Sequence, residues 1–203
     1  MTNKIKFNFI ILVLTFIFWS CNESKIDFKN LASTTSKGIM AVIEIPSGTN
    51  RKIEYNSSTQ RFEIDIKNGK ERVIDFLSYP GNYGFIPSTL MDEELGGDGD
   101  ALDILVIAES LETGDTISVI PIGTLLLNDS GELDTKIIAV PADPKKQVIQ
   151  ATDYQTFTVK YNMAQRIVEN WFLNYKGLGI TKLIGWRNDA FAMQEIEKWR
   201  IPQ

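Results

Sequence analysis

The sequence contains no histidine and only one cysteine, Cys21, among its 203 residues. The missing imidazoles exclude a Ser-His-Asp triad, a histidine general base and any zinc site that depends on histidine. The single cysteine excludes an internal disulfide and a thiolate cluster. The chemistry of the protein must therefore use carboxylates, lysine, arginine, tyrosine or hydroxyl groups, or a metal ion that oxygen atoms hold.

Basic residues are also in deficit. The chain has 21 Lys and Arg against 26 Asp and Glu, which gives a formal net charge of −5. Because a nucleic-acid-binding protein needs a basic face, we expect no nucleic-acid partner. The apolar fraction of 43% and the charged fraction of 23% are ordinary for a globular protein, and the length suits one domain with a proper core.

The first 21 residues have the pattern of an export leader. Lys4 and Lys6 precede an apolar run, residues 7–19, which is short for a membrane span but suits a signal peptide. The run ends two residues before Cys21, which resembles the lipidation site of a bacterial lipoprotein. We expect residues 1–20 to be a signal peptide and Cys21 to be lipidated, so that the protein is exported and anchored to a membrane on its periplasmic or surface side. The alternatives are an uncleaved N-terminal anchor, or a cytoplasmic protein if the leader is not processed.

A polar stretch separates this leader from the folded domain. Residues 22–37 are rich in Ser, Thr, Asn and Lys and predict a flexible linker, so the domain is expected over residues 38–203. Apolar or alternating segments predict strands at residues 38–46, 52–56, 61–66, 103–108, 116–127 and 136–140, with turns at residues 57–59, 68–69 and 128–134. Short strands joined by turns predict a small closed barrel.

The apolar residues of the tail recur with helical spacing in two groups. They are Met163, Ile167, Val168, Trp171 and Phe172 on one face of a first helix, and Ala192, Ile196 and Trp199 in a second helix expected over residues 189–200. The predicted fold is mainly β with flanking helices (α+β): a five-stranded barrel of the OB type with C-terminal helices packed outside it.

Aspartates are concentrated at two points where apolar strands begin. Asp98, Asp100 and Asp103 fall within six residues, and Asp129 and Asp134 lie in the turn before another predicted strand. A single Asp is usually solvent-exposed, but five of them at one rim of a barrel repel each other unless hard cations lie between them. Oxygen ligands alone suit Mg²⁺ or Mn²⁺, with waters that complete the coordination. The pattern therefore predicts a site for more than one divalent metal ion.

Cations and phenols accompany these acids near turns and strand ends. They are Lys52, Arg72, Lys136, Lys176, Tyr79, Tyr83 and Tyr175. Each basic residue alone fits a solvated surface, and each tyrosine alone fits strand packing. Together with metal ions, however, the set suits a highly charged phosphate.

The ordered motifs resemble those of the soluble family I inorganic pyrophosphatases. The aspartate signature of that family, D-G-D-P-x-D followed by an apolar residue, is similar to "DGDALDI" here, with Ala101 in place of the proline. Further matches follow in the family's order: "VIEIP", "KIE", "YPGNYGFIPST", "DSGELDTKIIAVP" and "NYKGL". The resemblance covers roughly residues 38–186.

The resemblance implies a role for each matching residue. Asp100 corresponds to the proposed general base, Glu54 is an accessory acid, and Tyr79 supports the site from behind. The metal-binding residues implied are Asp98, Asp100, Asp103, Asp129, Asp134 and Glu44. The phosphate-contacting residues implied are Lys52, Arg72, Tyr83, Lys136, Tyr175 and Lys176, and Arg72 matches with a shift of one residue.

The activity that the resemblance implies is hydrolysis of inorganic pyrophosphate to two orthophosphates by a metal-activated water, without a covalent intermediate. The cofactor implied is Mg²⁺, several ions per site, with Mn²⁺ as a substitute and Ca²⁺ as an inhibitor. We also expect a homo-oligomer. Two other functions stay open: a non-catalytic surface lipoprotein that binds metal or phosphate, and a hydrolase of larger phosphoanhydrides such as nucleotides.

Overall fold

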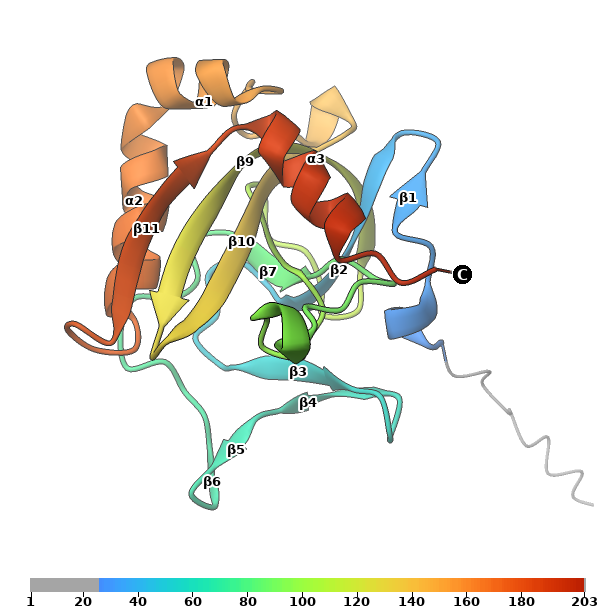
Figure 1. Cartoon of the computed structure of the whole chain (residues 1–203), viewed down its shortest axis with the longest axis vertical. Coiled ribbons are helices and arrows are strands. Elements are labelled where there is room, and N and C mark those ends of the chain that lie inside the picture. The colour runs from blue at the N-terminus through green and yellow to red at the C-terminus, as the bar shows by residue number, and fades with distance from the viewer. Residues whose placement is uncertain (1–25, 203) are drawn as a thin grey trace, which may run out of the picture.

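Five strands close into a ring at the centre of the molecule. The computed structural model describes residues 26–202. In spatial order the ring consists of β2 (Gly38–Ile45), β7 (Asn82–Phe85), β8 (Asp103–Val106), β10 (Glu132–Pro141) and β9 (Thr116–Asp129). Strand β9 pairs back with β2 and so closes the ring (Figure 1). Only the neighbours β8 and β10 are parallel among these pairs. The expected mainly β fold with a five-stranded barrel is confirmed.

Alternate residues of the ring strands face two separate cores. On β8, Ile104 and Val106 belong to one hydrophobic cluster and Leu105 to another, as the two-residue repeat of a strand requires. The C-terminal helix contributes to the first cluster, and the helices that precede it contribute to the second. Burial on both faces explains why these strands read as almost continuous apolar runs.

Helices follow the strands in the chain and cover the barrel. The C-terminal elements are α1 (Tyr154–Lys160), α2 (Asn162–Asn174), β11 (Thr181–Arg187) and α3 (Asp189–Lys198). The helix predicted over residues 189–200 is α3, and its Ala192, Ile196 and the following Trp199 are buried as expected. The sequence prediction lacks α1, β7 and β11, the last of which pairs with the outer edge of β9 (Figure 1).

The apolar face expected on α2 is wrong in part. Val168, Trp171 and Phe172 are buried, whereas Met163 and Ile167 are 60% and 59% exposed. Nine residues separate Met163 from Phe172, which is about two and a half turns of an α-helix, so the two side chains point to opposite sides. The five residues therefore do not share one buried stripe.

Two hairpins extend from the barrel on one side. Their strands are β3 (Ile53–Asn56), β4 (Arg61–Ile64), β5 (Ile66–Lys67) and β6 (Lys70–Glu71). Asn68 and Gly69 connect β5 and β6 with φ angles of 55° and 73°. Positive φ at both central residues is the geometry of a type I′ hairpin turn, which confirms the turn that the Asn-Gly pair predicts.

The loop expected over residues 128–134 is shorter in the structure. Strand β9 continues to Asp129 and β10 begins at Glu132, so only Ser130 and Gly131 form the turn. Both have positive φ, 58° and 111°. As a result Asp129 and Asp134 lie on paired strands, and the hydrogen-bond ladder fixes their positions.

The N-terminal segment contradicts part of the expected linker. Residues 28–35 pack on the barrel: a 3₁₀ helix, η1 (Phe28–Asn30), is followed by strand β1 (Thr34–Thr35), which pairs with β2. The ring of Phe28 lies 5.4 Å from that of Tyr55, centroid to centroid. Apolar Phe28 and Leu31 bury surface in a stretch that is polar on average, which composition alone did not show. The fold thus begins before residue 38.

The expected signal peptide, residues 1–20, and Cys21 lie outside the described residues. Within residues 26–202, none of the helices combines the length and the apolar character needed to cross a membrane.

Candidate active site

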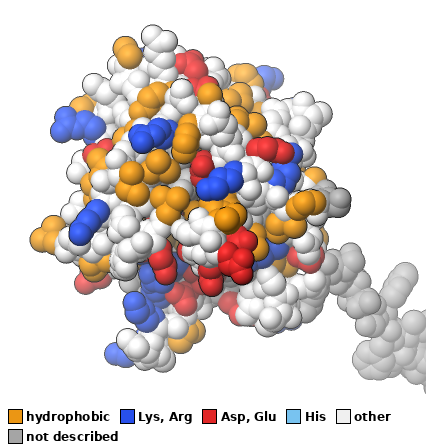
Figure 2. Space-filling view, in the orientation of Figure 1, with side chains coloured by type: hydrophobic (Ala, Val, Ile, Leu, Met, Phe, Trp, Pro, Cys, Tyr) orange, Lys and Arg blue, Asp and Glu red, His pale blue; other side chains and the backbone are white. Residues whose placement is uncertain are grey.

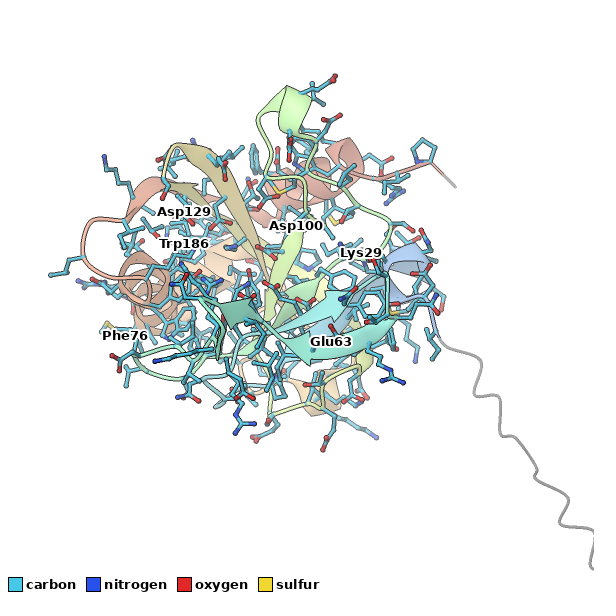
Figure 3. All side chains as sticks on the ribbon, turned by 90° about the horizontal axis from the view of Figure 1, so that it is seen from below. Lys29, Glu63, Phe76, Asp100, Asp129 and Trp186 are labelled. Atoms are coloured by element: carbon cyan, nitrogen blue, oxygen red, sulfur yellow. The ribbon has the colours of Figure 1, made fainter. Side chains whose placement is uncertain are left out.

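One cavity of about 250 Å³ opens between the barrel and the β3–β4 hairpin. Its walls contain all twelve residues that the sequence assigns to metal or phosphate: Glu44, Lys52, Arg72, Tyr83, Asp98, Asp100, Asp103, Asp129, Asp134, Lys136, Tyr175 and Lys176. Figure 3 views the molecule from this side, with Asp129, Asp100 and Lys29 spread across it. The structure therefore brings the whole predicted set together.

Strand register places three charged groups at one side of the cavity. Lys136 on β10 is the ladder partner of Asp103 on β8, and Asp134 lies two residues earlier on the same face of β10. The Lys136 ammonium forms ion pairs with both carboxylates and donates a hydrogen bond of 3.0 Å to the hydroxyl of Tyr83. Burial alone would lower the pKa of Lys136, but Asp103 and Asp134 outweigh it and hold the pKa well above its usual value.

A second ion pair joins the end of β9 to the segment after α2. Lys176 donates to the carboxylate of Asp129. Burial would raise the pKa of Asp129, yet its hydrogen bond from Lys176 lowers it overall. Next to Lys176, the Tyr175 ring stacks on Trp171 at 4.5 Å and 9°. The Trp171 Nε1–H donates to the Leu77 carbonyl at 2.8 Å, so this aromatic support is fixed in place.

Asp98 and Asp100 come from a glycine-rich loop between η2 (Glu93–Leu95) and β8. A Cβ on Gly97 would lie 2.4 Å from backbone atoms of Met91, so only glycine fits there. The Asp100 N–H donates to the Asp98 carboxylate at 3.0 Å. Burial, together with the charges of Asp103 and Asp100, raises the pKa of Asp98. The loop therefore carries negative charge that calls for a cation.

Glu44 lies on β2, and Lys52 directly precedes β3. A Glu44 carboxylate oxygen accepts the N–H of Tyr55 at 2.7 Å, and Lys52 forms an ion pair with Glu54. The Glu44 side chain lines the cavity, and burial together with the nearby charge of Asp103 raises its pKa to about 8.

Tyrosines form the floor of the cavity. Tyr83 is half-buried beside Asp103. Desolvation of its hydroxyl and the charge of Asp103 raise its pKa well above the usual value, so it stays a neutral hydrogen-bond donor. Tyr79 is 3% exposed and packs against Trp171, with ring centroids 4.4 Å apart. Its ring lies 5.4 Å from that of Tyr83, centroid to centroid, and it also lines the cavity, so the supporting role expected for it stays a prediction.

Three further charged residues were not predicted. Lys29 and Glu132 line the cavity, and Asp65 forms an ion pair of 3.0 Å with Arg72. Lys29 falls in the segment read as linker, and Glu132 in the segment read as a loop. Asp65 directly follows β4, and its place in the alternating pattern predicts only an exposed surface acid. Only the folded chain distinguishes these three.

The donor set fits Mg²⁺ in its chemistry. Eight carboxylates line the cavity: Glu44, Glu54, Asp98, Asp100, Asp103, Asp129, Glu132 and Asp134. Within residues 26–202, no three carboxylates already converge as metal ligands, and Asp103, Asp129 and Asp134 instead hold lysine ammonium groups. An ammonium between two carboxylates and the raised pKa of Asp98 both indicate a demand for positive charge. Oxygen-only ligands are the preference of Mg²⁺.

Carboxylates suited to hard cations, beside ammonium and guanidinium groups suited to phosphate oxygens, are typical of the class of metal-dependent phosphoryl-transfer enzymes. Comparison with known proteins agrees and is more specific. Residues 41–201 match the family model described as inorganic pyrophosphatase. The chain belongs to the inorganic pyrophosphatase family.

The alignments with individual relatives cover most of the length of each relative. The inorganic pyrophosphatase of Neisseria meningitidis serogroup A is 36% identical over 185 residues, 85% of this chain and 97% of that protein. The inorganic pyrophosphatase of Haemophilus influenzae is 39% identical over 168 residues, which cover 79% and 87% of the two chains. The crystal structure of the Thermus thermophilus inorganic pyrophosphatase superimposes with a TM-score of 0.73 at 29% identity and covers 85% of this chain and 95% of that one.

Proposed function

We propose that this protein hydrolyses inorganic pyrophosphate to two orthophosphates. The observation that carries this proposal is the convergence of eight carboxylates and five cationic side chains in one cavity of about 250 Å³. Such a cavity is below the usual size of drug-binding pockets and suits a small, highly charged ligand. The family membership supports the same substrate.

The carboxylates divide the work between metal binding and proton transfer. The metal ions would be held by Asp98, Asp103, Asp129, Asp134 and Glu44 together with Asp100. Asp100 also accepts the proton of the attacking water, since it is exposed at the cavity and makes no ion pair within the described residues. When bound, Mg²⁺ lowers the pKa of water and neutralises phosphate charge.

The cations and tyrosines bind the phosphate groups. The cavity is lined by Lys52, Arg72, Lys136 and Lys176 together with Tyr83 and Tyr175, and each has hydrogen atoms to donate to phosphate oxygens. Their charge stabilises the phosphate that leaves. Among the described residues, the cavity wall includes no serine, threonine or cysteine, so direct attack by water is the route that the site supports.

Release of phosphate from pyrophosphate by the full chain in detergent tests the proposal. We expect rapid release with Mg²⁺, slower release with Mn²⁺, inhibition by Ca²⁺ and none in EDTA. Tripolyphosphate and ATP, assayed in parallel, test the alternative of a hydrolase of larger phosphoanhydrides. That alternative predicts comparable rates on pyrophosphate, tripolyphosphate and ATP. No release at any Mg²⁺ concentration from folded protein would contradict an enzyme and favour the non-catalytic binding lipoprotein.

We further propose that the protein is exported and held at a membrane by a lipid on Cys21. The support is the leader pattern of residues 1–20 and the position of the only cysteine directly after it. Metabolic labelling with a radioactive fatty acid tests this, because the label should follow the wild-type protein and be lost in Cys21→Ser. Unchanged membrane association of Cys21→Ser would favour the uncleaved N-terminal anchor, and recovery in the cytoplasm would contradict export.

We also propose that the chain forms a homo-oligomer. Apolar side chains are exposed on α2 and β11, among them Met163, Ile167, Leu183 and Ile184, and hydrophobic side chains spread over the face drawn in Figure 2. Light scattering after chromatography measures the mass. We expect a multiple of the chain mass for the wild type and the monomer mass for Ile167→Asp or Leu183→Asp.

A further inference from the structure

Lys29 reaches the catalytic cavity from outside the part of the chain that defines the family. The family match begins at residue 41, whereas Lys29 belongs to η1 and lines the same cavity as Asp100. Figure 3 labels both residues on the face that carries the opening. The lysine is half-buried.

Contacts on both sides of Lys29 fix its backbone. Phe28 packs against Phe62 with ring centroids 5.0 Å apart, and its N–H donates to the hydroxyl of Tyr55 at 3.3 Å. The Lys29 carbonyl accepts the N–H of Ser88 at 2.7 Å, and the Ser88 hydroxyl donates to the Leu31 carbonyl at 2.8 Å. A residue held in this way presents its side chain at a defined place.

The same contacts tie η1 to the aspartate loop. Phe28 and Leu31 pack against the hydrophobic cluster that also receives Ala101. The residue after Ser88, Thr89, accepts the N–H of Leu102 at 2.9 Å through its hydroxyl. These contacts therefore link η1 to Ala101 and Leu102, the two residues that follow Asp100.

Lys29 differs from the other cations of the cavity in its pairing. Lys52, Arg72, Lys136 and Lys176 each form an ion pair with a carboxylate. Lys29 forms none with any carboxylate within residues 26–202. An ammonium at the cavity wall that has no carboxylate partner is available to an anionic ligand.

We propose that Lys29 is a further substrate-binding residue, whose ammonium binds a phosphate oxygen of pyrophosphate from the side of the cavity that Tyr55, Phe85 and Ala101 form. The inference rests on the proposed pyrophosphate hydrolysis and names one more contact in that site. It makes the N-terminal segment, residues 26–35, part of the active site and not merely a connection to the leader.

Two measurements on the full chain in detergent test the inference. Steady-state kinetics with Mg²⁺ and pyrophosphate give KM and kcat, and calorimetry with imidodiphosphate, a non-hydrolysable analogue, gives Kd. The variants are Lys29→Gln, Lys29→Arg and the matched control Lys37→Gln. Lys37 is an exposed lysine in the same segment that lies outside the cavity wall, and its substitution changes the net charge equally.

We expect Lys29→Gln to raise KM and the Kd of imidodiphosphate about tenfold while kcat changes less than about threefold, because one charge-assisted contact is lost. Lys29→Arg should restore most of the affinity, and Lys37→Gln should match the wild type. Equal effects of Lys29→Gln and Lys37→Gln would overturn the inference. So would a fall in melting temperature that accounts for the loss and that Lys29→Arg does not correct.

The calorimetric measurement separates this inference from the proposed function. If the wild type released no phosphate, the proposed hydrolysis would fail, yet imidodiphosphate binding would still report on Lys29. If the wild type were active and Lys29→Gln bound imidodiphosphate normally, only the inference on Lys29 would fail.

Discussion

The cavity has two walls that differ in how their charges are held. The strand wall consists of Asp103, Asp129, Asp134 and Lys136, all on β8, β9 and β10. The loop wall consists of Asp98 and Asp100, in the loop before β8, and Lys29, in η1, so that none of the three lies on a strand. Every charge of the strand wall is in an ion pair, whereas none of the loop wall is within the described residues.

This difference indicates a division of labour. On the strand wall, ladder register sets the distance between charges, and opposite charges compensate for their burial before any ligand binds. On the loop wall, glycines allow the acids to crowd together with no such compensation. We therefore expect the strand wall to govern the stability of the metal-free protein and the loop wall to govern metal binding and turnover.

The largest expected effect is on the loop wall. Asp100→Asn removes a charge and a proton acceptor together, so we expect kcat to fall about a thousandfold or more. Phosphate release at saturating Mg²⁺ measures it. The control is Asp92→Asn, which keeps a capping residue for η2 and should leave kcat unchanged. Similar losses in the two variants would contradict the role of Asp100.

The next effect is on the strand wall. Lys136 is 4% exposed, and Lys136→Met leaves Asp103 and Asp134 facing each other without a cation. We expect the unfolding free energy in EDTA to fall by about 3 to 5 kcal/mol. Urea denaturation measures it, and Mg²⁺ should recover part of the loss. Lys29→Met, on the loop wall, should change stability by less than about 0.5 kcal/mol. Equal losses in the two variants would end the distinction between the walls.

Glu44 gives the comparison a pH dependence. Its pKa is raised from 4.5 to about 8, so the folded protein binds its proton more tightly than the unfolded chain does. Metal-free stability should therefore fall as pH rises from about 4.5 to about 8, by a few kcal/mol at most at about 1.4 kcal/mol per pKa unit. Glu44→Gln keeps an acceptor for the Tyr55 N–H and should flatten this slope in EDTA. Identical slopes in both proteins would contradict the raised pKa.

The smallest effect contrasts two aspartates. Because the pKa of Asp98 is raised, its charge weakens the metal-free fold above the pKa of the unfolded chain, and Asp98→Asn should increase stability at pH 7 in EDTA. The gain is less than about 1 kcal/mol, since Asp98 is partly exposed to solvent. Asp103→Asn should instead lower stability, because it removes a partner of buried Lys136. Thermal unfolding in EDTA measures the melting temperatures of both variants. A shift of the same sign in the two variants would contradict the difference between the walls.

Much of the strand wall was predictable from sequence. Asp103 precedes an apolar strand, and Asp134 and Lys136 share the two-residue period of the next, so alternation alone places them at one rim. The loop wall acids were predictable as a motif, but their pairing state was not. Pairing depends on which side chains meet across the barrel, and no local pattern encodes those contacts.

The errors of prediction have a common physical origin. The polar average composition of the segment around Phe28 predicts a flexible linker. In the structure, however, Phe28 and Leu31 pack the segment against the cluster that contains Tyr55 and Phe62. Helical spacing predicts that Met163 and Ile167 share a buried face with Val168 and Phe172. In the structure, only Val168 and Phe172 of these four are buried. In both cases tertiary contacts decide, and these are set by residues far away in the sequence. Lys29 was missed for the same reason.

The stacking of Trp171 on Tyr175 connects the cavity to a fluorescent side chain. The indole is 3% exposed, anchored through its nitrogen to the Leu77 carbonyl, and parallel to a phenol ring that lines the cavity. The emission of an indole depends on the groups packed against it. An anion that draws the Tyr175 hydroxyl toward itself is therefore expected to change the emission of Trp171. Tryptophan fluorescence should thus report occupancy of the cavity without an added label.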